Sequence, residues 1–172
     1  MPLKKICFLL LFSCLLLTAC NPVIQEEKRP SGQVIAAAPE EIISTAFFAY
    51  SVDNALSSRM LQNYLPQEKE AVFLCLDLTI RNENKETVPM DYSDFLIVWQ
   101  EGNETGSAYP LQLFCDTQLP DRYSLLASEQ RSGQLIYQVP KGINCFLLRY
   151  QEIYTDDYIG NTYEVSITLP DK

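Results

Sequence analysis

Cys20 is the residue whose surroundings point most directly to a chemical reaction. It ends the tetrapeptide Leu17-Thr18-Ala19-Cys20, which closes an uncharged apolar stretch that begins after Lys4-Lys5. The lysines would hold the N-terminus on the cytoplasmic side, and the stretch, at about 14 residues, is shorter than the ~20 that a membrane-spanning helix needs. The small residues before the thiol would let the pocket of a peptidase admit the backbone and cut the chain before Cys20.

The tetrapeptide resembles the lipobox of bacterial lipoproteins. This resemblance implies that residues 1–19 are a lipoprotein signal peptide, that Cys20 receives a diacylglycerol, and that the protein is held on the extracytoplasmic side of the cell membrane. Two or three acyl chains anchor a protein stably where one does not. An ordinary cleaved signal peptide, or a short membrane anchor, is the alternative.

The charge balance restricts the partners. The formal net charge of −9 becomes −11 once Lys4 and Lys5 leave with the signal peptide. A chain this acidic is repelled by nucleic acid and by anionic lipid headgroups. We therefore expect no nucleic-acid partner, and we expect the membrane to be contacted through the lipid anchor.

Three cysteines remain after the signal peptide and the lipidated residue are set aside: Cys75, Cys115 and Cys145. An odd number allows at most one bridge within the chain. If a bridge forms, Cys75 and Cys145 are the favoured pair because both fall in strand-like segments, and three thiols without a bridge are an equally open alternative. Without a histidine or a CxxC pair, the sequence does not favour a zinc or redox site.

The paired carboxylates, Asp91 with Asp94 and Asp156 with Asp157, are the residues that raise the question of catalysis. Two such acids could cleave a glycosidic bond. A serine or cysteine nucleophile would need a positioned base, and the chain contains no histidine. We expect the protein not to be an enzyme.

Calcium is the only ion that the sequence suggests, and no other cofactor is expected. Glu152, Asp156 and Asp157, or Asp116 and Asp121, could supply hard oxygen ligands from loops. No Asp-x-Asp-x-Asp-Gly pattern supports either set. A solvated acidic loop is the alternative.

Tyrosines are numerous near the C-terminus. Tyr150 and Tyr163 fit inward positions, which leaves Tyr154 and Tyr158 as candidate contacts with a protein partner. Tyrosine suits recognition because it offers a large contact area at little cost in side-chain entropy. Packing of these rings within the core and the loop is the alternative.

The elements that must position these residues are strands. Residues 20–42 are rich in proline and charge and predict a flexible tether. Between residue 43 and residue 172 there are several runs in which apolar side chains recur at every second position, and Gly, Pro and Asn separate these runs. The clearest run is Ala71 to Arg81, whereas Ala55 to Leu65 fits either a short helix or a strand. About seven such strands without amphipathic helices predict an all-β, antiparallel β-sandwich.

These residues also resemble the immunoglobulin-like domains of unknown function found on lipoproteins and secreted proteins of Gram-positive bacteria, whose fold is similar to a secreted mycobacterial immunogenic antigen. The pattern departs from that family at Ala127-Ser128-Glu129, where Pro-Gly-Glu is usual, and this weakens the prediction of a tight turn. The resemblance brings no catalytic or ligand residues. It rests on Leu78-Thr79-Ile80-Arg81-Asn82, Val88-Pro89-Met90, Tyr92-Ser93-Asp94-Phe95, Leu119-Pro120, Tyr123-Ser124-Leu125, the run from Gly133 to Pro140, and Leu148-Arg149-Tyr150.

Together these observations predict a lipid-anchored immunoglobulin-like module that binds another envelope or secreted protein without catalysing a reaction. A lipoprotein that binds a small ligand or calcium is the alternative function.

Overall fold

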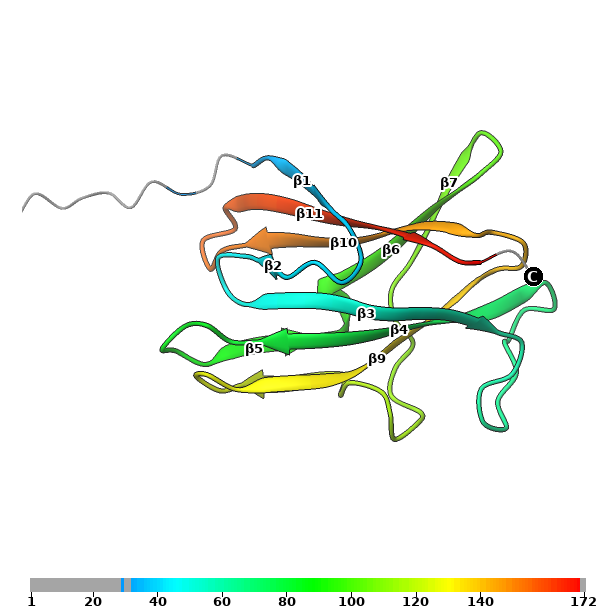
Figure 1. The fold of residues 1–172 in the computed structure, drawn as a ribbon, viewed down its shortest axis with the longest axis horizontal. Helices are drawn as coiled ribbons and strands as arrows, with labels where there is room; N and C mark the ends of the chain where they lie inside the picture. The colour runs from blue at the N-terminus through cyan, green and yellow to red at the C-terminus, as the bar shows by residue number, and fades with distance from the viewer. Residues whose placement is uncertain (1–28, 30–31, 171–172) are drawn as a thin grey trace, which may run out of the picture.

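The computed structural model describes residue 29 and residues 32–170 (Figure 1). The predicted signal peptide and Cys20 lie outside the described residues. Within the described part of the chain, no helix is both long and apolar enough to span a membrane.

The described chain is built from strands and one short 3-10 helix. The structure confirms the long alternating strands and adds short ones that the pattern did not predict. In chain order these are β1 (Val34–Ala37), β2 (Ile43–Ser44), β3 (Ala49–Ser58), β4 (Ala71–Arg81), β5 (Val88–Asp91), η1 (Tyr92–Asp94), β6 (Phe95–Glu101), β7 (Glu104–Ala108), β8 (Arg122–Leu125), β9 (Gln130–Pro140), β10 (Cys145–Ile153) and β11 (Ile159–Thr168).

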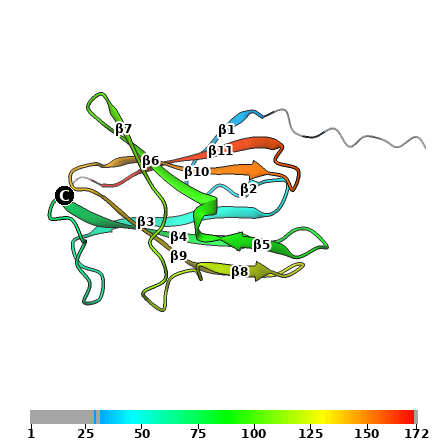
Figure 2. The same ribbon diagram turned by 180° about the vertical axis from the view of Figure 1, so that it is seen from behind.

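Two sheets face each other, so the predicted β-sandwich is confirmed (Figures 1 and 2). One has the order β1-β11-β10-β6-β7 and the other the order β2-β3-β4-β9, while β5 and β8 form a separate two-stranded ribbon. All pairs are antiparallel except β1 with β11, which is parallel.

The core lies between the two larger sheets and follows the alternation of the sequence. Leu74 and Ile80 of β4 and Leu148 and Val165 of the facing sheet are fully buried in one cluster. Burying an aliphatic side chain of this kind contributes about 1.5–3 kcal/mol to folding. A second, smaller cluster covers the outer face of β4 and β9, where Phe73, Cys75 and Ile136 pack against Cys115.

The predicted tether is wrong in its last part. Strand β1 pairs with β11 in register, from Val34 opposite Thr162 to Ala37 opposite Val165, and the Glu40 N–H donates to the Val52 carbonyl at 3.0 Å. Strand β11 offers an open edge there, and this pairing orders a segment whose composition alone predicts disorder.

The predicted bridge between Cys75 and Cys145 is also wrong. Cys75 faces outward from β4, Cys145 faces outward from β10 in the opposite sheet, and both thiols are free, as is that of Cys115. The sandwich core separates the first two, whereas a disulfide requires Cα atoms within about 7 Å. Burial raises the pKa of the Cys75 thiol to about 11, with smaller contributions from Cys115 and Asp77.

The turn that departs from the family pattern still forms. Ser128 adopts a φ of 62°, the left-handed conformation that glycine usually supplies. Glu129 stabilises it, because its backbone N–H donates to the Leu126 carbonyl at 2.9 Å and its carboxylate accepts from the Leu126 N–H at 2.7 Å. Arg131 donates to the same carboxylate at 2.7 Å.

Candidate functional site

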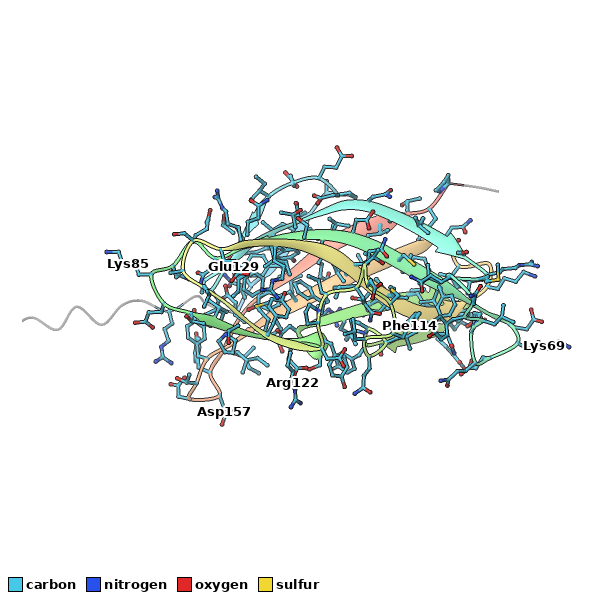
Figure 3. The ribbon with its side chains drawn as sticks, turned by 90° about the horizontal axis from the view of Figure 1, so that it is seen from below. Lys69, Lys85, Phe114, Arg122, Glu129 and Asp157 are labelled. Carbon is cyan, nitrogen blue, oxygen red and sulfur yellow. The ribbon has the colours of Figure 1, made fainter. Side chains whose placement is uncertain are left out.

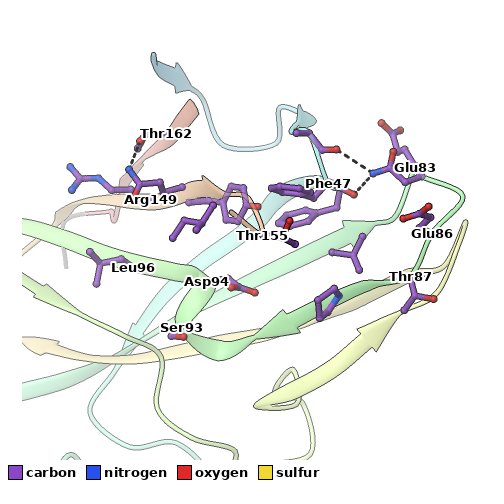
Figure 4. A pocket seen from close by; sticks show the side chains of 18 of the residues that line it. Phe47, Glu83, Glu86, Thr87, Ser93, Asp94, Leu96, Arg149, Thr155 and Thr162 are labelled. Atoms are coloured by element: carbon purple, nitrogen blue, oxygen red, sulfur yellow. Dashed lines mark hydrogen bonds between the residues drawn. The ribbon is translucent and has the colours of Figure 1, made fainter. Parts of the chain in front are cut away.

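A groove lies at one end of the sandwich. Strand β10 pairs with β6 only from Phe146 to Tyr150, because β6 begins at Phe95 and η1 turns the preceding chain away toward β5. Beyond that point β10 keeps only β11 as a neighbour, and β5 pairs with β8 alone. The end groove, of about 1420 Å³, opens between these two strands and is lined by residues 46–48, 83–89, 93–94 and 149–151, with further side chains from both walls (Figure 4).

The two loops that frame the end groove lie at the same end of the molecule. Figure 3 shows Lys85, in the loop before β5, and Asp157, in the β10–β11 hairpin, at one end and Lys69 at the other. Apolar side chains stand on the groove wall: Val34, Tyr109 and Ile153 are each more than half exposed. Apolar surface that stays uncovered beside a concavity is typical of binding sites.

Aromatic rings form the floor of the end groove. The Tyr150 ring lies 4.8 Å from that of Phe48 and 5.6 Å from that of Phe95, measured between centroids. Tyr150 and Phe48 also line the groove. The floor is therefore rigid, because these rings belong to the main core cluster.

Asp94 is the titratable group at the foot of this groove (Figure 4). Its carboxylate accepts from the Asp91 N–H at 2.7 Å, while the Asp91 carboxylate accepts from the Ser93 N–H at 3.0 Å, which makes a reciprocal cap on η1. Burial raises the pKa of Asp94 to about 6, with a smaller contribution from the charge of Asp91. Hydrogen bonds from Ser93, and then the Arg122 ion pair, lower the pKa of Asp91.

We expect Asp94→Asn to change how stability depends on pH. A carboxyl whose pKa is raised on folding stabilises the folded state at low pH, and this contribution is lost as the pH rises through about 6. The amide cannot ionise but still accepts from the Asp91 N–H. The variant should therefore be more stable than wild type by about 1–3 kcal/mol at pH 7.5, and the difference should shrink toward zero at pH 4.

Urea unfolding at pH 4, 6 and 7.5, followed by the fluorescence of Trp99, measures this difference. Asp116→Asn, which changes an exposed acid outside the groove lining, is the matched control. A loss of stability that is the same at every pH would mean that Asp94 acts only as a cap.

Glu152 does not lie in a loop, as the calcium prediction requires, but is fully buried near the end of β10. Its carboxylate accepts from the Ala46 N–H at 2.7 Å, the Asn161 N–H at 2.9 Å and the Tyr163 hydroxyl at 3.0 Å. A Cβ on Gly160 would stand 2.5 Å from its Oε2, so only glycine permits this approach. Glu152 thus ties β10 to β11 and to the segment before β3.

The hairpin between β10 and β11 carries Tyr154 and Tyr158, the two predicted partner contacts. Their rings meet at 5.7 Å, and the Tyr154 ring also lies 5.0 Å from that of Phe47, which lines the end groove. Tyr158 is 37% exposed and Tyr154 is half-buried. The hairpin therefore continues one wall of the groove.

Arg29 reaches this hairpin from the other end of the sequence. Its guanidinium donates to the Asp156 carboxylate at 2.6 Å and lies over the rings of Tyr154 and Tyr158, 5.3 and 5.4 Å from their centroids. The hydrogen bond from Arg29 lowers the pKa of Asp156.

The predicted calcium ligands are not brought together. Glu152 is saturated by protein donors, Asp156 pairs with Arg29, and Asp157 is an exposed residue at a φ of 61° on the hairpin. Among the described residues, no three or more acids, cysteines or histidines cluster in a way that could hold a metal ion. The ion pair and the internal hydrogen bonds account for these carboxylates instead.

Comparison with models of protein families finds a match that covers most of the chain. Residues 40–161 match the family described as a domain of unknown function (DUF4352). The chain belongs to this family. A search of curated proteins finds no match.

Solved structures support the same fold. A Bacillus subtilis protein described as a "putative lipoprotein" (ycdA) matches with a TM-score of 0.57 and 18% identity over 76% of this chain, which spans only 39% of that protein's chain. The Bacillus subtilis yjhA protein matches with a TM-score of 0.51 and 14% identity over 76% of this chain and 98% of its own. These two structures therefore share the β-sandwich fold of this DUF4352 chain.

Proposed function

We propose that this DUF4352 protein is a lipid-anchored, non-catalytic interaction module on the extracytoplasmic side of a bacterial cell membrane. Support for the anchor comes from the tetrapeptide ending in Cys20 and from the similarity in fold to a protein described as a "putative lipoprotein". Its partner is another envelope or secreted protein.

The end groove is the observation that carries the binding role. It combines an aromatic floor, exposed apolar residues on its wall and two strand segments that, among the described residues, each pair with a strand on one side only. Free strand edges let an extended peptide add main-chain hydrogen bonds, and adjacent apolar surface lets its side chains be recognised. The groove is therefore suited to an extended segment of a partner protein.

The arrangement of the acids supports a non-catalytic role. Asp91 and Asp94 are engaged in capping η1, and Asp156 is engaged with Arg29. At least one carboxylate of each pair thus has a structural use in the fold, and no nucleophile with an adjacent histidine base is available in this sequence.

Cross-linking on intact cells, followed by mass spectrometry of the proteins that stay attached, tests this function. We expect a specific envelope or secreted protein to be recovered with the wild-type chain and lost with the Cys20→Ala variant. Replacing both Tyr154 and Tyr158 with alanine should reduce the recovery, and unchanged recovery would exclude the hairpin as the contact. If no protein is recovered, the module is not an adaptor, and a small ligand becomes the better occupant of the groove.

A further inference from the structure

One guanidinium in this molecule is held by three side chains of a single hairpin. Arg29 lies 5.3 Å from the ring centroid of Tyr154 and 5.4 Å from that of Tyr158, and donates to Asp156 at 2.6 Å. Aromatic faces attract a cation through the ring quadrupole, and a carboxylate adds charge-assisted hydrogen bonding. The three hairpin residues, here called the tyrosine cage, meet both requirements at once.

The tyrosine cage is built by the folded domain and not by its occupant. The Tyr154 N–H donates to the Tyr158 carbonyl at 2.9 Å, and the Asp157 N–H donates to the Tyr154 carbonyl at 2.9 Å, which closes the hairpin. Phe47 supports the Tyr154 ring from outside the hairpin at 5.0 Å. The cage is therefore arranged to receive a guanidinium whichever chain supplies it.

The ion pair that holds Arg29 is exposed to solvent. The side chain of Arg29 is 47% exposed, that of Asp156 is 56% exposed, and Arg29 lies 127 residues from Asp156 in sequence. Exposed ion pairs are weak and are screened by salt. Because Arg29 belongs to the same chain, it meets the hairpin at a high effective concentration.

We propose that the tyrosine cage is an arginine-binding site, filled by Arg29 in the isolated chain and by an arginine of the partner protein in the complex. The second half of this statement rests on the proposed interaction function. An arginine suits the cage better than a lysine, because a planar guanidinium stacks on rings while its N–H groups reach a carboxylate. The negative net charge of the chain also favours a partner segment that carries positive charge.

The test is a titration of the full lipoprotein in detergent micelles with L-arginine amide, followed by NMR of 13C-labelled tyrosine rings. In the Arg29→Ala variant, we expect the ring signals of Tyr154 and Tyr158 to shift saturably. L-lysine amide, which has the same charge, should bind several-fold more weakly. The wild-type chain should need about five to ten times more arginine amide, since its own arginine competes for the cage.

Two further variants keep the result specific. Asp156→Asn in the Arg29→Ala background should weaken arginine binding without removing either ring. Arg122→Ala, which deletes an arginine paired with Asp91 away from the hairpin, should leave the titration as in wild type. Equal shifts with arginine and lysine amides, or no saturable shift in Arg29→Ala, would overturn the proposal. Such a failure would leave the cross-linking test of the module's interaction function unaffected.

Discussion

Replacing Glu152 with alanine should lower the free energy of unfolding by about 3–5 kcal/mol, one of the largest effects expected of any single substitution in this domain. The side chain is fully buried and accepts from Ala46, Asn161 and Tyr163 at 2.7–3.0 Å. Alanine would leave all three donors without this partner, and a buried donor such as the Tyr163 hydroxyl costs about 1–3 kcal/mol when it is left unsatisfied. It would also leave a cavity beside Gly160.

Glu152→Gln separates the loss of hydrogen bonding from the loss of volume. Oε1 of Glu152 accepts from Ala46 and Tyr163, and Oε2 accepts from Asn161. An amide keeps only one acceptor and directs an NH₂ group at a donor. We expect a loss of about 1–3 kcal/mol, smaller than that of the alanine variant.

Urea unfolding at pH 7, followed by the fluorescence of Trp99, measures the free energy of unfolding of the wild type and of both Glu152 variants. Glu104→Ala, which removes an exposed glutamate from β7, is the matched control and should stay within about 0.5 kcal/mol of wild type. If Glu152→Ala also stayed within that range, the three hydrogen bonds would contribute little to stability.

The sequence contained the signal that places Glu152 inside. Phe146, Leu148 and Tyr150 alternate along one face of a strand, and Glu152 continues the same series by one step. Its charge instead led to a loop assignment and to the calcium prediction. A buried carboxylate needs several protein donors, and these come from segments about 100 residues apart in sequence, which alternation within one strand cannot reveal.

The sandwich itself was predictable because its long strands carry their own pattern. In β4 and β10 every second residue is buried in the shared core, which is what the period of two requires. The short strands were not predicted because they contain too few residues to show an alternating pattern of their own. Strand β1 spans only four residues, and its order comes from pairing with β11.

The candidate site depends on features that no local pattern carries. The end groove exists because β6 begins opposite Tyr150 while β10 continues to Ile153. A difference in strand length of this kind is set by the register of two strands far apart in the chain. The exposed position of Tyr158 was predicted because Tyr150 and Tyr163 fit the inward positions, but the arginine beside it was not.

Replacing Cys20 with alanine should abolish lipidation completely. If the thiol of Cys20 carries the diacylglycerol, then alanine offers no nucleophile for the thioether, and the cut before residue 20 no longer follows. Cells fed an alkyne-tagged fatty acid should label the wild-type chain, whereas the variant should fall to background and keep residues 1–19. Cys14→Ala is the matched control, because it removes a thiol from the same apolar stretch and should leave labelling intact.

Labelling that survives in Cys20→Ala would contradict the lipobox assignment, and with it the lipid anchor of the proposed function. Because each buried CH₂ contributes about 0.8 kcal/mol to membrane binding, two acyl chains decide whether the domain stays at the cell surface.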